Sequence, residues 1–154
     1  MTGEPPQWEM LRPGAPHIWR TLGYRAVEAG EGRMVIDWEA DEAYAFPDTS
    51  DSVVVHGGMV ATLLDTAMGA ACASALTDGQ SFLTADLHVE FYRPARPGTL
   101  RADGRIVQRT RRVAFCAAEL SRSELERAFR SHTAAEWDAW ARRLDLPVEA
   151  LDGP

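Results

Sequence analysis

The short run His56-Gly57-Gly58, followed further along the chain by Asp65, contains the residue types best suited to chemistry. Paired glycines let the backbone approach a ligand closely and adopt unusual dihedral angles. At the start of a helix, unpaired N–H groups point outward and the helix dipole favours negative charge, which suits an oxyanion or a phosphate. Taken alone, the run is a weak signal, because a plain loop-to-helix turn with a packed histidine also explains it.

Asp65 lies within an apolar stretch. Residues 59–76 are rich in alanine, leucine and methionine, and they predict a buried helix that opens at Gly57-Gly58 and ends at Asp78-Gly79. A carboxylate in such a helix is costly unless it is hydrogen-bonded, paired, or exposed to a cavity or a partner surface. Asp65 is therefore either a structural residue bonded to a neighbouring strand or a functional carboxylate of the kind common at active sites.

The spacing between the two motifs has a geometric consequence. His56 and Asp65 are nine residues apart, which is roughly 13 Å along a helix axis. The backbone donors and the carboxylate of one chain are thus too far apart to act on the same small reacting group. A symmetric dimer with antiparallel helices would bring the helix start of one subunit to Asp65 of the other, creating two equivalent sites.

Strand patterns lie on both sides of the predicted helix. They occupy residues 24–28, 33–39, 82–92, 99–108 and 113–120, while 127–137 fits either a last strand or the start of a helix. A connector with two glycines joins the first two strands, which is a hairpin signal, and residues 40–55 predict a loop. Residues 82–92 alternate strictly between apolar and polar side chains. This order predicts an α+β fold, with an antiparallel sheet wrapped around one long central helix.

Bulk composition narrows the classes of function. The 154 residues suffice for one domain with a real core, and we expect an irregular arm at 1–19, the main domain at 20–138 and a tail at 139–154. A net charge of −7 argues against nucleic-acid binding. The N-terminus lacks the features of a signal peptide, and a mid-span Asp65 argues against a membrane helix. We therefore expect a cytoplasmic protein with no nucleic-acid or membrane partner.

The two cysteines, Cys72 and Cys116, lie in alanine-rich apolar stretches. They predict buried thiols that act as small hydrophobic side chains, although counting alone leaves a disulfide open. The sequence has neither a CxxC pair nor a cluster of cysteine and histidine, so no metal site is expected.

Two runs of residues resemble the PaaI-type hotdog-fold thioesterases. Residues 55–67, Val-His-Gly-Gly-Met-Val-Ala-Thr-Leu-Leu-Asp-Thr-Ala, are similar to the family signature. Residues 84–95, Thr-Ala-Asp-Leu-His-Val-Glu-Phe-Tyr-Arg-Pro-Ala, are similar to the strand and turn that follow it, and 104–120 to the next two strands. The resemblance implies a hotdog fold, homodimers that commonly pair into homotetramers, and hydrolysis of acyl-CoA thioesters without any cofactor.

By position, the resemblance implies roles for individual residues. Gly57 would supply the N–H that polarises the thioester carbonyl, and Asp65 of the neighbouring subunit would act as general base on water or as nucleophile. His56 would orient the thioester or the loop, and Thr84 would help to hold the attacking water. The expected substrate contacts are Gly58, Phe91, Arg111 and Arg112. Arginine's fork geometry suits the CoA phosphates, but the two arginines fit a solvated cluster at a strand end slightly better.

Two positions and one segment depart from the family pattern. Ser50 stands in the catalytic set where many members carry asparagine, and its hydroxyl has a shorter reach. Thr110 replaces a glycine between two strands, and residues 121–126 replace a glycine-containing turn. These departures keep open a non-catalytic acyl-CoA-binding protein. A dehydratase fits less well, because dehydratases of this fold place their histidine and carboxylate differently along the helix. The acyl group itself is left open.

Overall fold

The computed structural model of the chain describes residues 16–48 and 51–122. The chain divides into two units, residues 1–123 and 124–154, and the second lies wholly outside the described residues. The segment at 127–137 that was predicted as a strand or a helix therefore lies outside them, as does the predicted domain boundary at residue 138.

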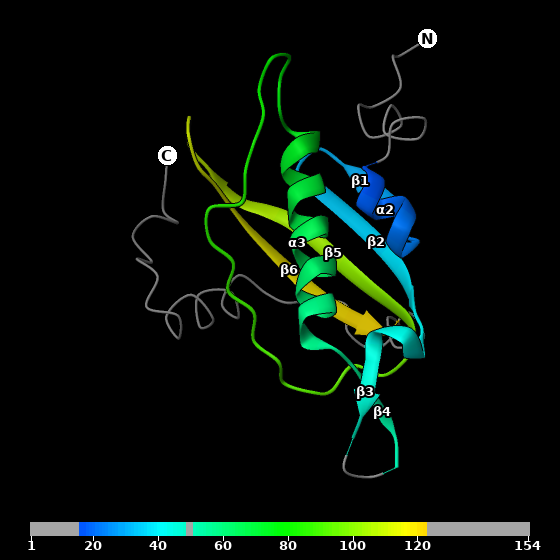
Figure 1. The fold of residues 1–154 in the computed structure, drawn as a ribbon. Coiled ribbons are helices and arrows are strands. Elements are labelled where there is room, and N and C mark those ends of the chain that lie inside the picture. The colour runs from blue at the N-terminus through cyan, green and yellow to red at the C-terminus, as the bar shows by residue number, and fades with distance from the viewer. Residues whose placement is uncertain (1–15, 49–50, 123–154) are drawn as a thin grey trace. The chain divides into compact units, whose positions relative to one another are not determined.

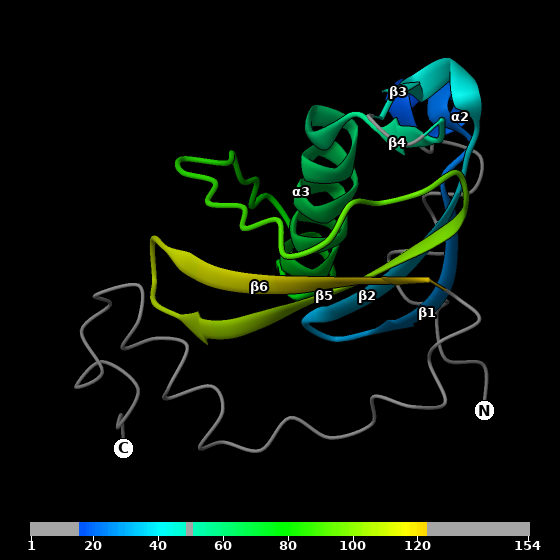
Figure 2. The same cartoon turned by 90° about the horizontal axis from the view of Figure 1, so that it is seen from below.

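One long helix lies across one face of a four-stranded antiparallel sheet (Figures 1 and 2). Strand order in this sheet is β1-β2-β5-β6, and β3 and β4 form a separate two-stranded sheet. In chain order the elements are α2 (His17–Leu22), β1 (Arg25–Gly30), β2 (Arg33–Ala40), η1 (Glu42–Tyr44), β3 (Ala45–Pro47), β4 (Val53–Val55), α3 (Gly57–Ser74), β5 (Gly98–Arg109) and β6 (Ala114–Arg122). The predicted α+β arrangement with one long central helix is confirmed.

The two long hairpins of the sheet confirm the predicted strands. In the first, Gly30 pairs with Arg33, and Gly32 in the turn has a φ of +74°, a conformation that favours glycine. In the second, the Thr110 N–H donates to the carbonyl of Val113 at 2.7 Å, and its hydroxyl accepts the Val113 N–H at 3.0 Å. Thr110 therefore closes this turn by hydrogen bonding where the family pattern has a glycine.

The central helix α3 begins at Gly57, as predicted, but it ends at Ser74 and not at Asp78. The Arg109 side chain donates to the carbonyl of Ala75, the residue that follows the helix. Gly79 is left-handed, with a φ of +77°, but it lies in the turn beyond. The prediction of the helix end was therefore wrong, since the glycine signal marks that turn and not the helix cap.

The segment 40–55, predicted as a loop, contains η1 and the β3–β4 hairpin. Asp41 caps η1 by accepting the Ala43 N–H at 2.6 Å, and Ala45 of β3 pairs with Val55 of β4. Only the residues between Pro47 and Val53 connect the strands. The prediction was wrong here because three-residue strands are too short to show a readable alternation.

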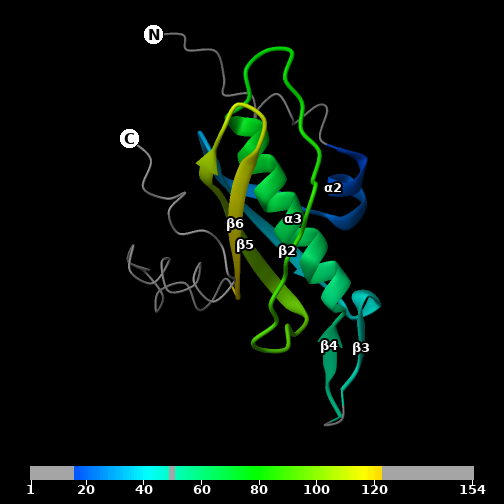
Figure 3. The same cartoon turned by 90° about the vertical axis from the view of Figure 1, so that its left-hand side faces the viewer.

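Residues 82–92, predicted as a strand, form no strand within the described part of the chain. They run back alongside α3 from its C-terminal towards its N-terminal end (Figures 1 and 3). Two apolar side chains of the alternating pattern are open to solvent, with Leu83 94% and Phe91 57% exposed, whereas Val89 is half-buried against the core. A strand needs a neighbour for its N–H and C=O groups, and among residues 16–48 and 51–122 no strand pairs with this segment.

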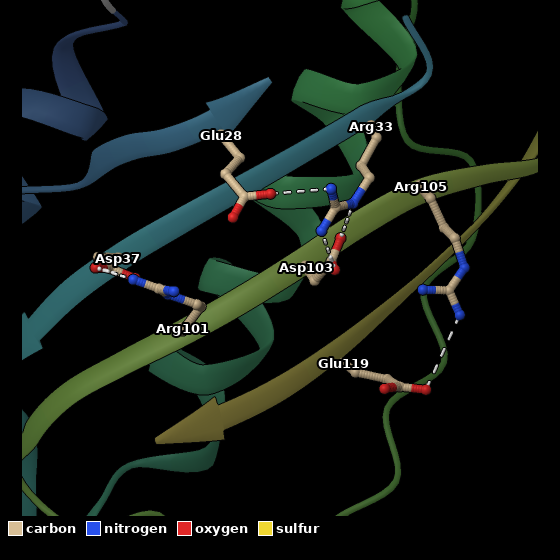
Figure 4. A network of polar contacts seen from close by, with 7 residues as sticks. All are labelled: Glu28, Arg33, Asp37, Arg101, Asp103, Arg105 and Glu119. Carbon is tan, nitrogen blue, oxygen red and sulfur yellow. Dashed lines mark hydrogen bonds and ion pairs between the residues drawn. The ribbon is translucent and has the colours of Figure 1, made fainter. Parts of the chain in front are cut away.

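The sheet face opposite α3 carries ion pairs between neighbouring strands (Figure 4). Arg101 donates to the two carboxylate oxygens of Asp37 at 2.6 and 2.9 Å, and Arg33 donates to those of Asp103 at 3.0 and 2.8 Å. Hydrogen bonding to Asp103 raises the pKa of Arg33. Since Asp37 is only 4% exposed, its pair with Arg101 fixes the register of β2 against β5, the surface on which α3 rests.

Gly104 on β5 allows α3 to lie close to the sheet. A Cβ at this position would meet the backbone of Ala67 and lie 2.7 Å from the nitrogen of Met68, and backbone cannot rotate out of the way. We expect Gly104→Ala to destabilise the protein by about 2–3 kcal/mol, measured by thermal or urea denaturation. Gly30→Ala is the matched control, because nothing lies within 4 Å of its added Cβ. Equal stability of the two variants would contradict this account of the packing.

Candidate active site

His56 organises the start of α3, which follows β4 directly. The residue is the N-cap of the helix, and its Nδ1 accepts the N–H of Gly58 at 2.9 Å. Because an accepting Nδ1 carries no proton, the neutral ring is protonated at Nε2. The ring also meets Phe46 edge-on, with centroids 6.2 Å apart. His56 thus fixes the first turn of the helix, where its predicted role was to orient the thioester or the loop.

The two glycines differ in what their N–H groups can do. The Gly58 N–H is taken by His56, so it is not available to a substrate. The N–H of the half-buried Gly57 finds no acceptor among the described residues. It lies at the first position of α3, where the helix dipole adds positive potential. Of the pair, Gly57 is therefore the donor that an anionic oxygen can use.

Phe91 packs directly on Gly57. A Cβ at Gly57 would lie 3.2 Å from the Cζ atom of Phe91, so the absence of a side chain makes room for this ring. The ring is itself 57% exposed. An apolar group bound beside the Gly57 amide would therefore contact Phe91.

Asp65 is half-buried and faces the segment after the helix. One carboxylate oxygen accepts the hydroxyl of Thr84 at 3.0 Å. The neighbouring hydroxyls of Thr62 and Thr66 donate to helix carbonyls instead, at 2.8 and 2.7 Å. No donor among the described residues reaches the second oxygen of Asp65. The carboxylate is therefore held at one oxygen and open to a water molecule at the other.

The Gly57 donor and the Asp65 carboxylate both lie on α3, but they are at different points along it. Thr84 contacts Asp65 and Phe91 contacts Gly57, so residues 82–92 run antiparallel to α3 (Figure 3). Gly57 and Asp65 are eight residues apart, which is about 12 Å of helical rise. One chain thus carries a donor end and a carboxylate end that cannot act on one carbonyl group.

Comparison with known proteins identifies the family. The profile of the thioesterase superfamily matches residues 53–128. A phenylacetic acid degradation-related protein from Ralstonia eutropha JMP134 is 31% identical, and its crystal structure matches 77% of this chain and 90% of that chain with a TM-score of 0.66. The chain belongs to the thioesterase superfamily. The region matched by the superfamily profile contains all the candidate site residues except Ser50.

Two further relatives are more distant or only partly matched. A Halobacterium salinarum protein named as an esterase is 42% identical over 91 residues, which cover 56% of this chain and 58% of that protein. This chain therefore matches little more than half the length of that curated relative. The E. coli PaaI protein from the phenylacetic acid degradation operon is 22% identical, with a TM-score of 0.65 over 77% of this chain and 81% of its own. It has the same fold, and the predicted PaaI-type hotdog architecture is confirmed.

Arg111 and Arg112 lie at the other end of α3 from Gly57 in this superfamily member. Both are exposed in the turn between β5 and β6. Their neighbour Arg109 donates to the Ala75 carbonyl after α3 and to Gln80. In one chain, the two arginines are therefore close to the C-terminal end of the helix.

Ser50 lies outside the described residues. Within residues 16–48 and 51–122, no group of three or more His, Cys, Asp or Glu side chains could hold a metal ion. None of the helices in the same part of the chain combines the length and apolar character needed to cross a membrane.

Both cysteines are free thiols, with Cys72 buried and Cys116 half-buried. The prediction of a buried residue was therefore right for Cys72 and wrong for Cys116, whose place on β6 leaves part of it open. Burial, with a smaller contribution from Cys72, raises the pKa of the Cys116 thiol to about 11. The thiol is therefore protonated at neutral pH and is a poor nucleophile.

Alkylation of Cys116 provides a test of this raised pKa. The thiolate is the reactive form, so the rate of reaction with iodoacetamide should keep rising from pH 8 to pH 10. A cysteine with an ordinary pKa would instead level off above about pH 9. Mass spectrometry of the peptide that contains Cys116 measures the rate, and a plateau near pH 9 would show that the thiol is not shielded.

Proposed function

We propose that the protein hydrolyses acyl-CoA thioesters to a free acid and CoA in the cytoplasm. The observation that carries the proposal is the Gly57 N–H, which has no acceptor among the described residues and lies beside the exposed Phe91 ring. A thioester carbonyl bound there would have its developing negative charge stabilised by this amide and by the helix dipole. Membership of the thioesterase superfamily supports the same class of reaction.

In the proposed reaction, Asp65 takes a proton from water as the water oxygen attacks the thioester carbonyl carbon. The Gly57 N–H holds the resulting oxyanion. Collapse of the intermediate breaks the C–S bond, and the CoA sulfur leaves with the proton that Asp65 had accepted. Thr84 holds one Asp65 oxygen and so directs the other to the water. If Asp65 attacks directly, the C–S bond breaks as a mixed anhydride forms and CoA leaves as the thiolate. Water then hydrolyses the anhydride, which restores the Asp65 carboxylate, releases the acid and supplies the proton of the CoA thiol.

The two ends of the site come together only in a dimer, which we propose to be symmetric, with a pair of dimers forming a tetramer. Residues 82–92 have the alternation of a strand, with exposed apolar side chains and no paired strand in the described chain. Antiparallel pairing of this segment with its copy, centred near Leu87 and His88, would place Thr84 within one residue of Phe91 of the partner subunit. Asp65 of one chain would thereby approach Gly57 of the partner subunit.

The same dimer gives a role to the arginines. Asp65 and Ala75 are separated by about 15 Å of helical rise, and Arg109 marks the far end of that interval. A CoA thioester at Asp65 whose pantetheine arm lay along α3 would bring its phosphates towards Arg111 and Arg112 of the same chain. We therefore propose that these arginines bind the CoA phosphates as bidentate donors.

A thiol-release screen tests the proposed function directly. Purified protein is incubated with aromatic and aliphatic CoA esters, phenylacetyl-CoA and medium-chain esters included, and released CoA thiol is measured over time. We expect repeated turnover of at least one ester. Thermal stabilisation by CoA esters without any thiol release would instead support a non-catalytic acyl-CoA-binding protein.

A further inference from the structure

The side chain of Arg96 joins segments that meet just before α3. One guanidinium nitrogen, Nη1, donates to the Ser52 hydroxyl at 2.5 Å and to the Val53 carbonyl at 3.0 Å. The other, Nη2, donates to the Asp48 carboxylate at 2.9 Å. Asp48 directly follows β3, and Val53 is the first residue of β4, so one guanidinium holds both strands of this hairpin.

Backbone contacts continue the same connection. The carbonyl of Ala95 accepts the N–H of Val55 at 2.8 Å, so residues 95 and 96 hold the two ends of β4. The hairpin is also closed within itself, because Asp48 N–H donates to the Ser52 carbonyl at 2.6 Å. β4 then continues without a break into His56 and Gly57. Any shift of β4 therefore shifts the Gly57 amide.

The segment that ends in Arg96 also covers the donor. Phe91, five residues earlier, packs on Gly57, and Thr84 near the start of the same segment contacts Asp65. Arg96 and Asp48 are only 34% and 25% exposed at their side chains, so water screens their ion pair less than a fully exposed one. Arg96 thus links β4, the strand that leads into the oxyanion donor, to the segment that covers this donor.

We propose that Arg96 is a positioning residue that sets the Gly57 N–H at the place of the thioester oxygen. Asp48 is its main partner, and the inference rests on the proposed thioesterase function. Arginine suits this task because its planar fork reaches three acceptors at fixed angles, whereas a lysine ammonium is a single point. A small displacement of a preorganised donor weakens binding of the transition state far more than binding of the substrate.

Kinetics of four variants separate positioning from plain stabilisation. Arg96→Gln should lower kcat between tenfold and about a hundredfold while KM changes less than about threefold, and Arg96→Lys should recover part of the loss. Asp48→Asn, which keeps an acceptor oxygen but loses the charge, should fall between wild type and Arg96→Gln. Arg93→Gln is the matched control, since Arg93 is exposed in the same turn and no described residue bonds to its side chain. Its kcat should equal that of the wild type.

A second measurement does not depend on turnover. In ¹⁵N-labelled protein, the amide resonance of Gly57 should shift in Arg96→Gln and stay in place in Arg93→Gln. If wild type turns over no CoA ester while this resonance moves, the proposed function fails and the positioning of Gly57 by Arg96 stands. Unchanged kcat with a lowered melting temperature, or an unmoved Gly57 resonance in Arg96→Gln, would overturn the positioning role.

Discussion

Replacing Asp65 with asparagine should lower kcat/KM for the best CoA ester by about 10³-fold and leave the protein folded. Asparagine has nearly the same size, and its carbonyl oxygen can still accept the Thr84 hydroxyl that Asp65 accepts at 3.0 Å. What it cannot do is take a proton from water or attack the carbonyl carbon. The loss should therefore appear in thiol-release rates, with an unchanged circular dichroism spectrum and melting temperature.

The chain offers a matched control for the Asp65→Asn substitution. Glu31 is exposed in the turn between β1 and β2, outside the segment proposed to pair in the dimer. Glu31→Gln makes the same change from carboxylate to amide away from the proposed site, and it should retain wild-type turnover. Full activity in folded Asp65→Asn protein would exclude Asp65 both as general base and as nucleophile.

Periodicity decided which elements could be predicted from the sequence. The first hairpin, the helix and the β5–β6 hairpin are long enough for a repeating pattern to show, and their predictions are confirmed. The β3–β4 hairpin has only three residues in each strand, so it gave no pattern. The prediction of a strand at residues 82–92 was wrong for the opposite reason. Their alternation is clear, but a strand also requires a neighbouring strand to pair with, and the pattern within one segment does not show whether that neighbour exists.

The candidate site was predictable only where its partners are close in sequence. A helix start with a nearby capping side chain is local, so Gly57 and His56 could be singled out from their neighbours. Gly58 was expected as a substrate contact from the family resemblance, and the local pattern could not show that His56 accepts its N–H. Arg96 was missed, since its partner Asp48 lies 48 positions away and no spacing rule links the two charges.

Mixing Asp65→Asn subunits with Gly57→Pro subunits should restore activity that neither variant has alone. Proline at the first position of a helix is well tolerated. It removes the N–H in question and adds ring carbons, of which the Cβ would lie 3.2 Å from the Cζ atom of Phe91. His56 already has a ψ of 128°, the extended conformation that a residue before proline requires. Gly57→Ala is the matched control, because it adds a Cβ near Phe91 but keeps the N–H, and it should retain most of the activity.

The fraction of wild-type activity that should return follows from the sharing of each site between two subunits. In a heterodimer of the two variants, one site receives both intact groups and the other receives neither. Unfolding an equal mixture and refolding it makes half of the dimers heterodimers, so about a quarter of wild-type activity should return. A site contained within one chain would return none.

A second mixture distinguishes shared sites from sites within single chains by a loss of activity instead of a gain. Here the chain carrying both substitutions, Asp65→Asn and Gly57→Pro, is refolded with an equal amount of wild type. If sites are shared, every site of a heterodimer lacks one group, and only the quarter of dimers that are wild type in both subunits work. Activity then falls to about a quarter, whereas sites within single chains would leave half. Because poor refolding lowers activity in both mixtures, only a shared site can raise the first mixture from zero while pulling the second below one half.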